Sequence, residues 1–131
     1  MNKPEGAFRF AYFSRLYKET CSFYSQMLGL TLEHGWDEGD NKGSVFKAGK
    51  GLIEVLHLPN NPESYNAGLD LRPPQGAFMV VQVFNVDELF HNYKAKGLIF
   101  KQELTDQSWG HRSFTVTDPN GVSLFFFEER F

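Results

Sequence analysis

The side chains that first suggest chemistry are the histidines and one strand-borne glutamate. A neutral imidazole binds a metal ion or accepts a proton near neutral pH. The four histidines are scattered along the chain, however, at His34, His57, His91 and His111. His57 follows Glu54 by three residues in one predicted strand, so the two side chains point to opposite faces of the sheet. They are not expected to hold one ion together.

The other histidines add one possible contact. We expect His91 on a solvent-facing helix surface and His34 just before a turn. His111 stands beside Trp109 and Arg112. A Trp ring stacks on planar groups and an Arg pairs with anions, so this segment is predicted to contact a ligand. The alternative is that Trp109 packs on a sheet edge and Arg112 binds a backbone carbonyl.

Length and composition indicate one globular domain of the cytoplasmic type. A chain of 131 residues fits a single core, and its 14 Phe, 5 Tyr and 2 Trp must fill a core, a cleft or an interface. The net charge of −3, without basic runs, argues against nucleic acid. The lone Cys21 indicates a reducing compartment, and we do not expect it to act as a nucleophile. We expect neither a signal peptide nor a membrane span.

Elements of the first half follow from its periodicity. Residues 8–13 are β-prone, and a helical stripe follows that ends at Gly29, where a left-handed residue is easiest without a Cβ. Three short strands with tight turns are predicted between residues 31 and 58. The first half therefore reads as one strand, one helix and three strands.

The second half repeats that order. A strand is predicted over 77–84, and Asn85 with Glu88 three positions later forms a capping box for a helix that ends before Gly97. Three more strands are predicted between residues 98 and 129. Gly29 and Gly97 are 68 residues apart, and such regular spacing argues for a duplicated unit, although two segments can share an order by chance.

Domain organisation follows from this repeat. We predict a single domain over 1–131 with one module at about 7–58 and another at about 77–128. The joining segment 59–76 holds four of the six prolines and reads as an exposed linker.

Short motifs in a fixed order carry a resemblance to a known family. They are Phe23-Tyr24 with Met27-Leu28-Gly29-Leu30, Ile53-Glu54-Val55, Val86-Asp87-Glu88, Gly97, Trp109-Gly110-His111-Arg112 and Asp118-Pro119-Asn120-Gly121. From about residue 7 to 128 the chain resembles the vicinal-oxygen-chelate superfamily of glyoxalase I, bleomycin-resistance proteins, fosfomycin-modifying enzymes and extradiol dioxygenases. The resemblance implies an α+β fold in which two βαβββ modules form a partly open, curled mixed sheet around a cleft. It also implies a dimer.

The same resemblance locates the positions of a possible metal site. Members that bind a metal take one ligand from the first and one from the last strand of each module, typically His, Gln or Glu. Here these positions fall on Arg9, Glu54, Phe78 and Phe125, or on Leu124 if the last register shifts by one. Only Glu54 offers a donor, because a guanidinium does not deprotonate and a benzyl ring has no lone pair. We therefore predict no metal and no cofactor.

An aromatic ligand site is predicted in place of the metal. Arg9 is expected to pair with Glu54, since a buried unpaired charge is costly, with two solvated rim residues as the alternative. Phe78 and Phe125, with Trp109 and Arg112, complete the predicted ligand-binding set, although a plain core role for the two phenylalanines is the alternative.

The preferred function is a metal-free, homodimeric small-molecule binding protein that sequesters a drug or metabolite, as in antibiotic resistance. One alternative is a metal-dependent lyase, dioxygenase or thiol transferase of the same superfamily. Another is a metal-independent isomerase or lyase with Glu54 as general base. The sequence leaves enzymatic activity and the identity of the ligand open. The expected partners are a small molecule and a second copy of the chain, without nucleic acid or membrane.

Overall fold

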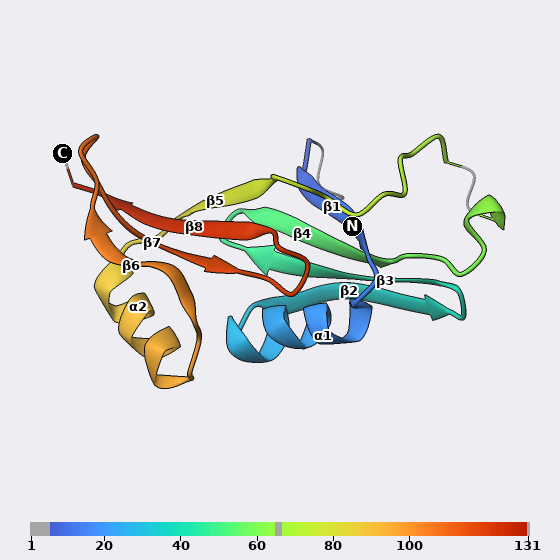
Figure 1. Cartoon of the computed structure of the whole chain (residues 1–131), viewed down its shortest axis with the longest axis horizontal. Coiled ribbons are helices and arrows are strands. Elements are labelled where there is room, and N and C mark those ends of the chain that lie inside the picture. The colour runs from blue at the N-terminus through green and yellow to red at the C-terminus, as the bar shows by residue number, and fades with distance from the viewer. Residues whose placement is uncertain (1–5, 65–66, 131) are drawn as a thin grey trace.

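Two consecutive modules of the same element order make up the fold (Figure 1). The computed structural model describes residues 6–64 and 67–130. The first module contains β1 (Arg9–Ser14), α1 (Tyr17–Ser22), β2 (Thr31–Glu38), β3 (Asn41–Ala48) and β4 (Gly51–His57). The second contains β5 (Phe78–Gln82), α2 (Val86–Ala95), β6 (Phe100–Asp106), β7 (His111–Thr117) and β8 (Ser123–Glu129). A π-helical turn, Phe23–Met27, extends α1, and a short 3₁₀ helix, Pro62–Ser64, lies in the connection.

Each module folds into a four-stranded mixed sheet with the same topology. The strand orders are β1-β4-β3-β2 and β5-β8-β7-β6, with β1 parallel to β4 and β5 parallel to β8. The remaining pairs are antiparallel. The registers correspond, since Arg9 lies opposite Leu52 in the first sheet and Phe78 lies opposite Ser123 in the second. The predicted α+β architecture of two βαβββ modules is thereby confirmed.

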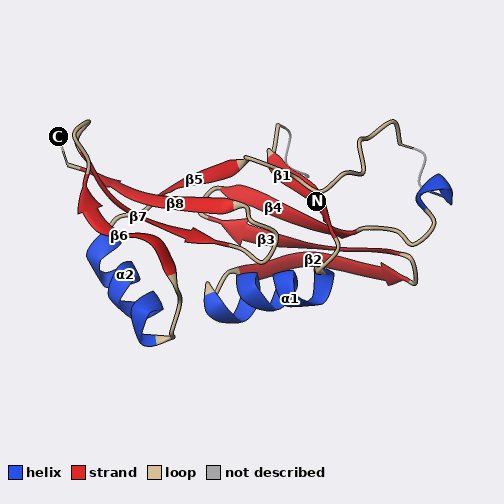
Figure 2. Ribbon diagram, in the orientation of Figure 1, coloured by secondary structure: helices blue, strands red, loops and turns tan. Residues whose placement is uncertain are grey.

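Both helices lie on the same side of the two sheets (Figure 2). We call the side of each sheet that packs on the helices its helix face, and the opposite side its open face. The helix faces and the helices share one apolar core, which includes Tyr24 and Phe46 from the first module and Phe90, Phe114 and Phe126 from the second. No helix among residues 6–64 and 67–130 has the length and apolarity to cross a membrane.

Alternation along β8 fixes which of its residues face away from the core. Leu124 and Phe126 are buried against the helix side, whereas Ser123 and Phe125 are half-buried on the open face. The candidate position in the last strand is therefore Phe125, and the alternative, Leu124, belongs to the core.

The predicted start and end of the second helix are confirmed. The side-chain oxygen of Asn85 accepts the backbone N–H of Glu88 at 3.1 Å, and the Asn85 amide donates to the Glu88 carboxylate at 3.3 Å. The helix ends before Gly97, whose φ of 88° is favourable only without a Cβ.

A buried polar cluster joins the two modules of one chain. Asp118, in the turn between β7 and β8, accepts the hydroxyls of Tyr12 and Tyr24 at 2.5 and 2.8 Å. Its other oxygen accepts the backbone N–H groups of Asn120 and Val122 at 2.8 and 3.0 Å. The turn of the second module is thus bonded to the core of the first.

Candidate functional site

A pocket of about 530 Å³ lies on the open face of the second sheet. This volume is in the range of small-molecule sites. The residues that line it come from β5, β6, β7, β8 and the segments beside them: Gly76, Ala77, Phe78, Val80, Lys101, Trp109, His111, Thr115, Gly121, Ser123 and Phe125. Three of the predicted ligand-binding residues, Phe78, Trp109 and Phe125, therefore meet in one pocket.

Large rings remain exposed in this pocket. Phe78 is 63% exposed and Trp109 57% exposed, so neither is a core residue. Phe78 stands at the start of β5, where alternation directs its neighbour Met79 into the core and Phe78 outward. Exposed rings on one concave surface lose unfavourable contact with water when a planar ligand covers them.

A hydrogen bond and a stacked ring orient the indole. Trp109 Nε1 donates to His111 Nδ1 at 3.0 Å, so the neutral imidazole carries its proton on Nε2. The His111 ring lies against the Phe127 ring, with centroids 4.3 Å apart and planes 18° apart. Because Phe127 is buried, this stack fixes His111 and, through it, Trp109 at the rim of the pocket.

Arg9 and Glu54 form the predicted ion pair, but outside this pocket. Arg9 Nη1 lies 2.8 Å from Glu54 Oε1, and the side chains are 46% and 17% exposed. Both belong to the open face of the first sheet. In the parallel register Ala11 lies beside Glu54, and Arg9, two residues before Ala11, points to the same face as Ala11. Neither residue lines the pocket on the second sheet.

We expect this ion pair to contribute modestly to stability, because Arg9 is half-exposed and water screens the charges. A double-mutant cycle with Arg9→Met and Glu54→Gln should give a coupling free energy of about 0.5 kcal/mol that falls with added salt. Urea unfolding of the four proteins measures it. A coupling of zero in low salt would mean that the two side chains act as independent rim residues.

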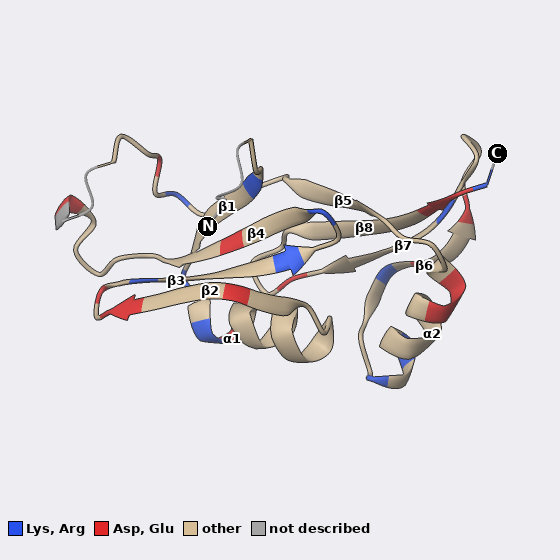
Figure 3. Ribbon diagram, turned by 180° about the vertical axis from the view of Figure 1, so that it is seen from behind, with Lys and Arg blue, Asp and Glu red and all other residues tan. Residues whose placement is uncertain are grey.

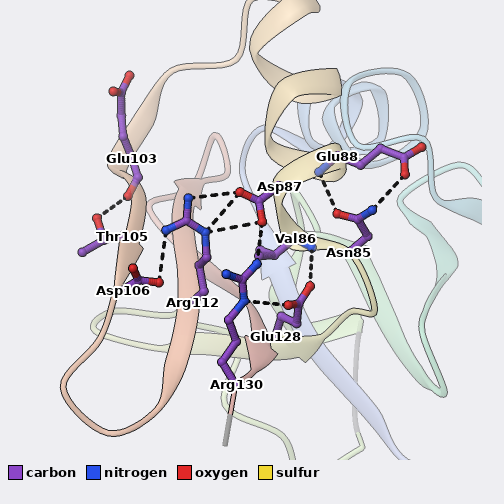
Figure 4. Close-up of polar contacts among 10 residues, drawn as sticks. All are labelled: Asn85, Val86, Asp87, Glu88, Glu103, Thr105, Asp106, Arg112, Glu128 and Arg130. Atoms are coloured by element: carbon purple, nitrogen blue, oxygen red, sulfur yellow. Dashed lines mark hydrogen bonds and ion pairs between the residues drawn. The ribbon is translucent and has the colours of Figure 1, made fainter.

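Arg112 lies away from the pocket, in an ion-pair network at the start of α2 (Figure 4). Its guanidinium donates to Asp87 at 3.0 and 3.1 Å and to Asp106 at 3.1 Å. Arg130 donates to Asp87 at 2.7 Å and to Glu128 at 2.8 Å. Arg112 lies between His111 and Ser113 in β7. Strand alternation points it away from the open face, where His111 lies, and toward the helix face. Arg112, predicted as a ligand contact, therefore does not line the pocket.

The network shifts the acidity of its carboxylates. The Arg112 guanidinium lowers the pKa of Asp87, and the Arg130 guanidinium lowers the pKa of Glu128. Glu128 also accepts the backbone N–H of Val86, the first residue of α2, at 3.1 Å. These contacts attach the helix to β7 and β8, so the role we assign to them is structural.

The side chains at the family's metal positions do not fit a metal ion. The matching registers make Arg9 equivalent to Phe78 and Glu54 equivalent to Phe125. Phenylalanine offers no lone pair, and the Glu54 carboxylate is bound by the Arg9 guanidinium. Across residues 6–64 and 67–130, no three His, Cys, Asp or Glu side chains gather in a way that suits an ion. The chemistry of this donor set argues against a metal-dependent role for these positions.

The remaining chemical candidates lie outside the pocket. His57 Nε2 is 3.4 Å from Asp40, and its ring meets the Tyr17 ring edge-on, on the face opposite Glu54 as predicted. His91 is exposed, as predicted. His34 does not precede a turn, because β2 continues to Glu38.

Cys21 is half-buried on α1. Burial raises the pKa of its thiol, which keeps it protonated near neutral pH. This agrees with the prediction that Cys21 is not a nucleophile.

Sequence reasoning missed Lys101 as a pocket residue. In the pairing of β6 with β7, Phe100 lies opposite Val116 and Gln102 opposite Thr115, so Lys101 is an extra residue at a β-bulge. Phe100 packs against the core, so Lys101, the next residue, points to the open face and lines the pocket there. Alternation in β6 gives this direction, but the sequence does not show which open-face residues of β6 border the pocket.

The geometry defines a class of protein, namely a paired βαβββ fold with an open aromatic pocket on one sheet. The family model described as the Glyoxalase/Bleomycin resistance protein/Dioxygenase superfamily matches residues 7–126. The chain belongs to this superfamily, as its motifs indicated.

Curated relatives and solved structures agree with this assignment. A bleomycin resistance protein from Geobacillus stearothermophilus is 26% identical over 119 residues, with 86% of this chain and 88% of the relative covered. TioX from Micromonospora sp. ML1 has a TM-score of 0.75 and 19% identity over 95% of this chain and 99% of its own. A lactoylglutathione lyase from Agrobacterium tumefaciens has a TM-score of 0.71 and 19% identity, with 96% of each chain covered. The two structures establish the shared fold.

Proposed function

We propose that this protein binds a small organic molecule in the pocket of the second sheet, without a metal ion. The observation that carries the proposal is the pocket of about 530 Å³ with Phe78 and Trp109 more than half exposed inside it. A concave, mainly apolar surface with a few polar groups is the usual form of a ligand site. Binding alone, such as the sequestration of a drug or metabolite, requires no further chemistry.

A curated relative and the position of Glu54 support this proposal. A relative of similar length is named a bleomycin resistance protein, which agrees with a role in binding a drug. The enzymatic alternatives need side chains that the pocket does not offer. Glu54, the candidate general base, is paired with Arg9 and does not line the pocket. A reducing, cytoplasmic location for the protein remains part of the proposal and follows from the lone Cys21.

A second copy of the chain is the proposed protein partner. Apolar side chains stand exposed along β5 and beside it, with Phe8 at 76%, Val80 at 54% and Phe84 at 103%. A contiguous apolar surface of this kind is typical of an interface. A homodimer that covers the open face would narrow the pocket into a cleft. Sedimentation that finds only monomer at ~100 μM, well above the Kd of a typical stable dimer, argues against this partner.

Trp109 provides the test of the pocket. A thermal-shift screen of drugs and metabolites, run with EDTA, should yield ligands whose affinity falls about 10- to 100-fold in Trp109→Ala, since a buried aromatic contact contributes ~1–3 kcal/mol. Calorimetric titration measures the affinity. The matched control is Ile99→Ala, because Ile99 is 89% exposed and does not line the pocket. Ligands that bind Trp109→Ala as tightly as the wild type would refute the site.

Elemental analysis separates binding from metal-dependent catalysis. We expect the purified protein to contain far less than one equivalent of Zn, Ni, Mn or Fe. A near-stoichiometric ion held by side chains would favour the enzymatic alternative. If an activity is detected and Glu54→Gln loses it but still binds the ligand, the result would favour the metal-independent isomerase or lyase.

A further inference from the structure

The charges around the pocket point to the class of ligand. Eleven residues line the pocket, and none of them is Asp or Glu. The one formal charge among them is the ammonium of Lys101. The overall charge of the chain is −3, so the lining differs in sign from the rest of the molecule.

Lys101 has no carboxylate partner among residues 6–64 and 67–130, unlike three other cations of the second half. Lys94 pairs with Glu103 at 3.4 Å, and Arg112 and Arg130 share Asp87. Within the described part of the chain, no carboxylate lies within ion-pair distance of Lys101. Its charge is therefore available to a ligand.

The position of Lys101 is built into the sheet. The β-bulge between Phe100 and Gln102 inserts Lys101 as an extra residue in β6. Because Phe100 packs against the core, Lys101 points to the opposite, open face of the sheet. Phe100 and Gln102 keep their partners in β7, so the pairing on both sides of Lys101 holds it at the pocket.

The polar groups around Lys101 are suited to an acceptor. Thr115 and Ser123 line the pocket with hydroxyls. Hydroxyls donate hydrogen bonds to an anion or a carbonyl. Glu129 lies opposite His111 in the register of β7 and β8 but does not line the pocket. Two strands that line the pocket carry acidic residues, Glu103 and Asp106 in β6 and Glu128 and Glu129 in β8 (Figure 3), but none of the four lines the pocket.

We infer that the ligand is a planar aromatic molecule carrying an acidic group, with its ring against Trp109 and Phe78 and its anion toward Lys101. This inference rests on the proposed function and adds the sign of the ligand's charge. It disfavours a polycationic drug, for which a cleft rich in carboxylates is the complementary surface.

Three naphthalene probes of the same ring size test the inference. We expect calorimetric titration at low salt, with EDTA, to give a Kd for 2-naphthoate about 10-fold lower than for 2-naphthylmethylammonium, with 2-naphthamide between them. Lys101→Gln should weaken 2-naphthoate several-fold without affecting the amide. Lys101→Glu should reverse the order of the two charged probes. Lys18→Glu makes the same charge change on α1 and should leave all three affinities unchanged.

The outcomes distinguish the inference from the proposed function. Trp109-dependent binding in which the ammonium probe equals or exceeds 2-naphthoate overturns the inference and leaves the binding function intact. Trp109-dependent binding of 2-naphthoate whose affinity is the same in both Lys101 variants as in the wild type also overturns the inference. If none of the three probes binds in a Trp109-dependent manner at millimolar concentration, both statements are contradicted.

Discussion

Replacement of Asp118 with alanine is expected to lower the free energy of unfolding by about 4 kcal/mol, because it leaves several buried donors without an acceptor. Asp118 is 4% exposed, and it accepts the hydroxyls of Tyr12 and Tyr24 and the backbone N–H groups of Asn120 and Val122. The loss acts on both modules, since the tyrosines belong to the first and the turn to the second. Urea unfolding followed by circular dichroism measures it.

Two variants isolate the cause of this effect. Asp118→Asn keeps the shape and one acceptor, so it should lose less stability than Asp118→Ala. Asp70→Ala removes an exposed carboxylate of the linker that pairs with Arg72, and it should change stability by less than about 0.5 kcal/mol. A change below 1 kcal/mol in Asp118→Ala would mean that the buried cluster does not hold the modules together.

Alkaline pH should destabilise the protein through its buried tyrosines. Burial raises the pKa of Tyr93 to about 12, and burial with nearby acidic groups raises the pKa values of Tyr12 and Tyr24. Tyrosine in the unfolded chain has a pKa of about 10, so the stabilisation is complete below pH ~10 and falls as pH rises toward the folded values. Between pH 10 and 11 the three residues together should reduce the free energy of unfolding by ~3 kcal/mol.

Tyr93→Phe provides the control for the alkaline effect. Tyr93 Oη donates to the backbone carbonyl of Leu28 at 2.9 Å, so the variant loses one hydrogen bond at neutral pH. The decrease in its free energy of unfolding between pH 10 and 11 should also be about a third smaller than that of the wild type. Urea midpoints measured at pH 9, 10 and 11 supply both quantities. A midpoint independent of pH in this range would show that the tyrosines ionise freely in the folded protein.

Local patterns in the sequence predicted the elements and their order, and the family resemblance implied how the two modules form sheets. Three of these patterns act over only a few residues: the alternation of apolar residues in each strand, the cap formed by Asn85, and the helix end at Gly97. Each can therefore be recognised without the tertiary structure. The π-helical turn at Phe23–Met27 was not predicted, and its residues fit a regular helical stripe as well. Register was also predictable, because each sheet has one buried face and a shift by one residue would expose it.

The candidate site was predictable only in part. The family resemblance gave the positions Arg9, Glu54, Phe78 and Phe125, and the registers of the two sheets put all four on the open faces. Lys101 was missed because alternation gives its direction but not its place beside the pocket, which depends on how β5 to β8 assemble.

Arg112 was predicted as a site residue from its neighbours in the sequence, whereas it pairs with Asp87, 25 residues away, and with Asp106 on the paired strand β6. The cluster around Asp118 was missed for the same reason, since Tyr12 lies 106 residues away. Such contacts depend on how the modules pack, and no local pattern encodes them.

The most direct test of a metal-free aromatic site is a crystal structure of the protein prepared with EDTA and soaked with 2-naphthoate. We predict density for the naphthalene ring against Trp109 and Phe78, with its carboxylate toward Lys101 and no ion at Glu54. A divalent ion held by protein atoms at the family's metal positions, or the probe bound elsewhere with this pocket empty, would contradict it.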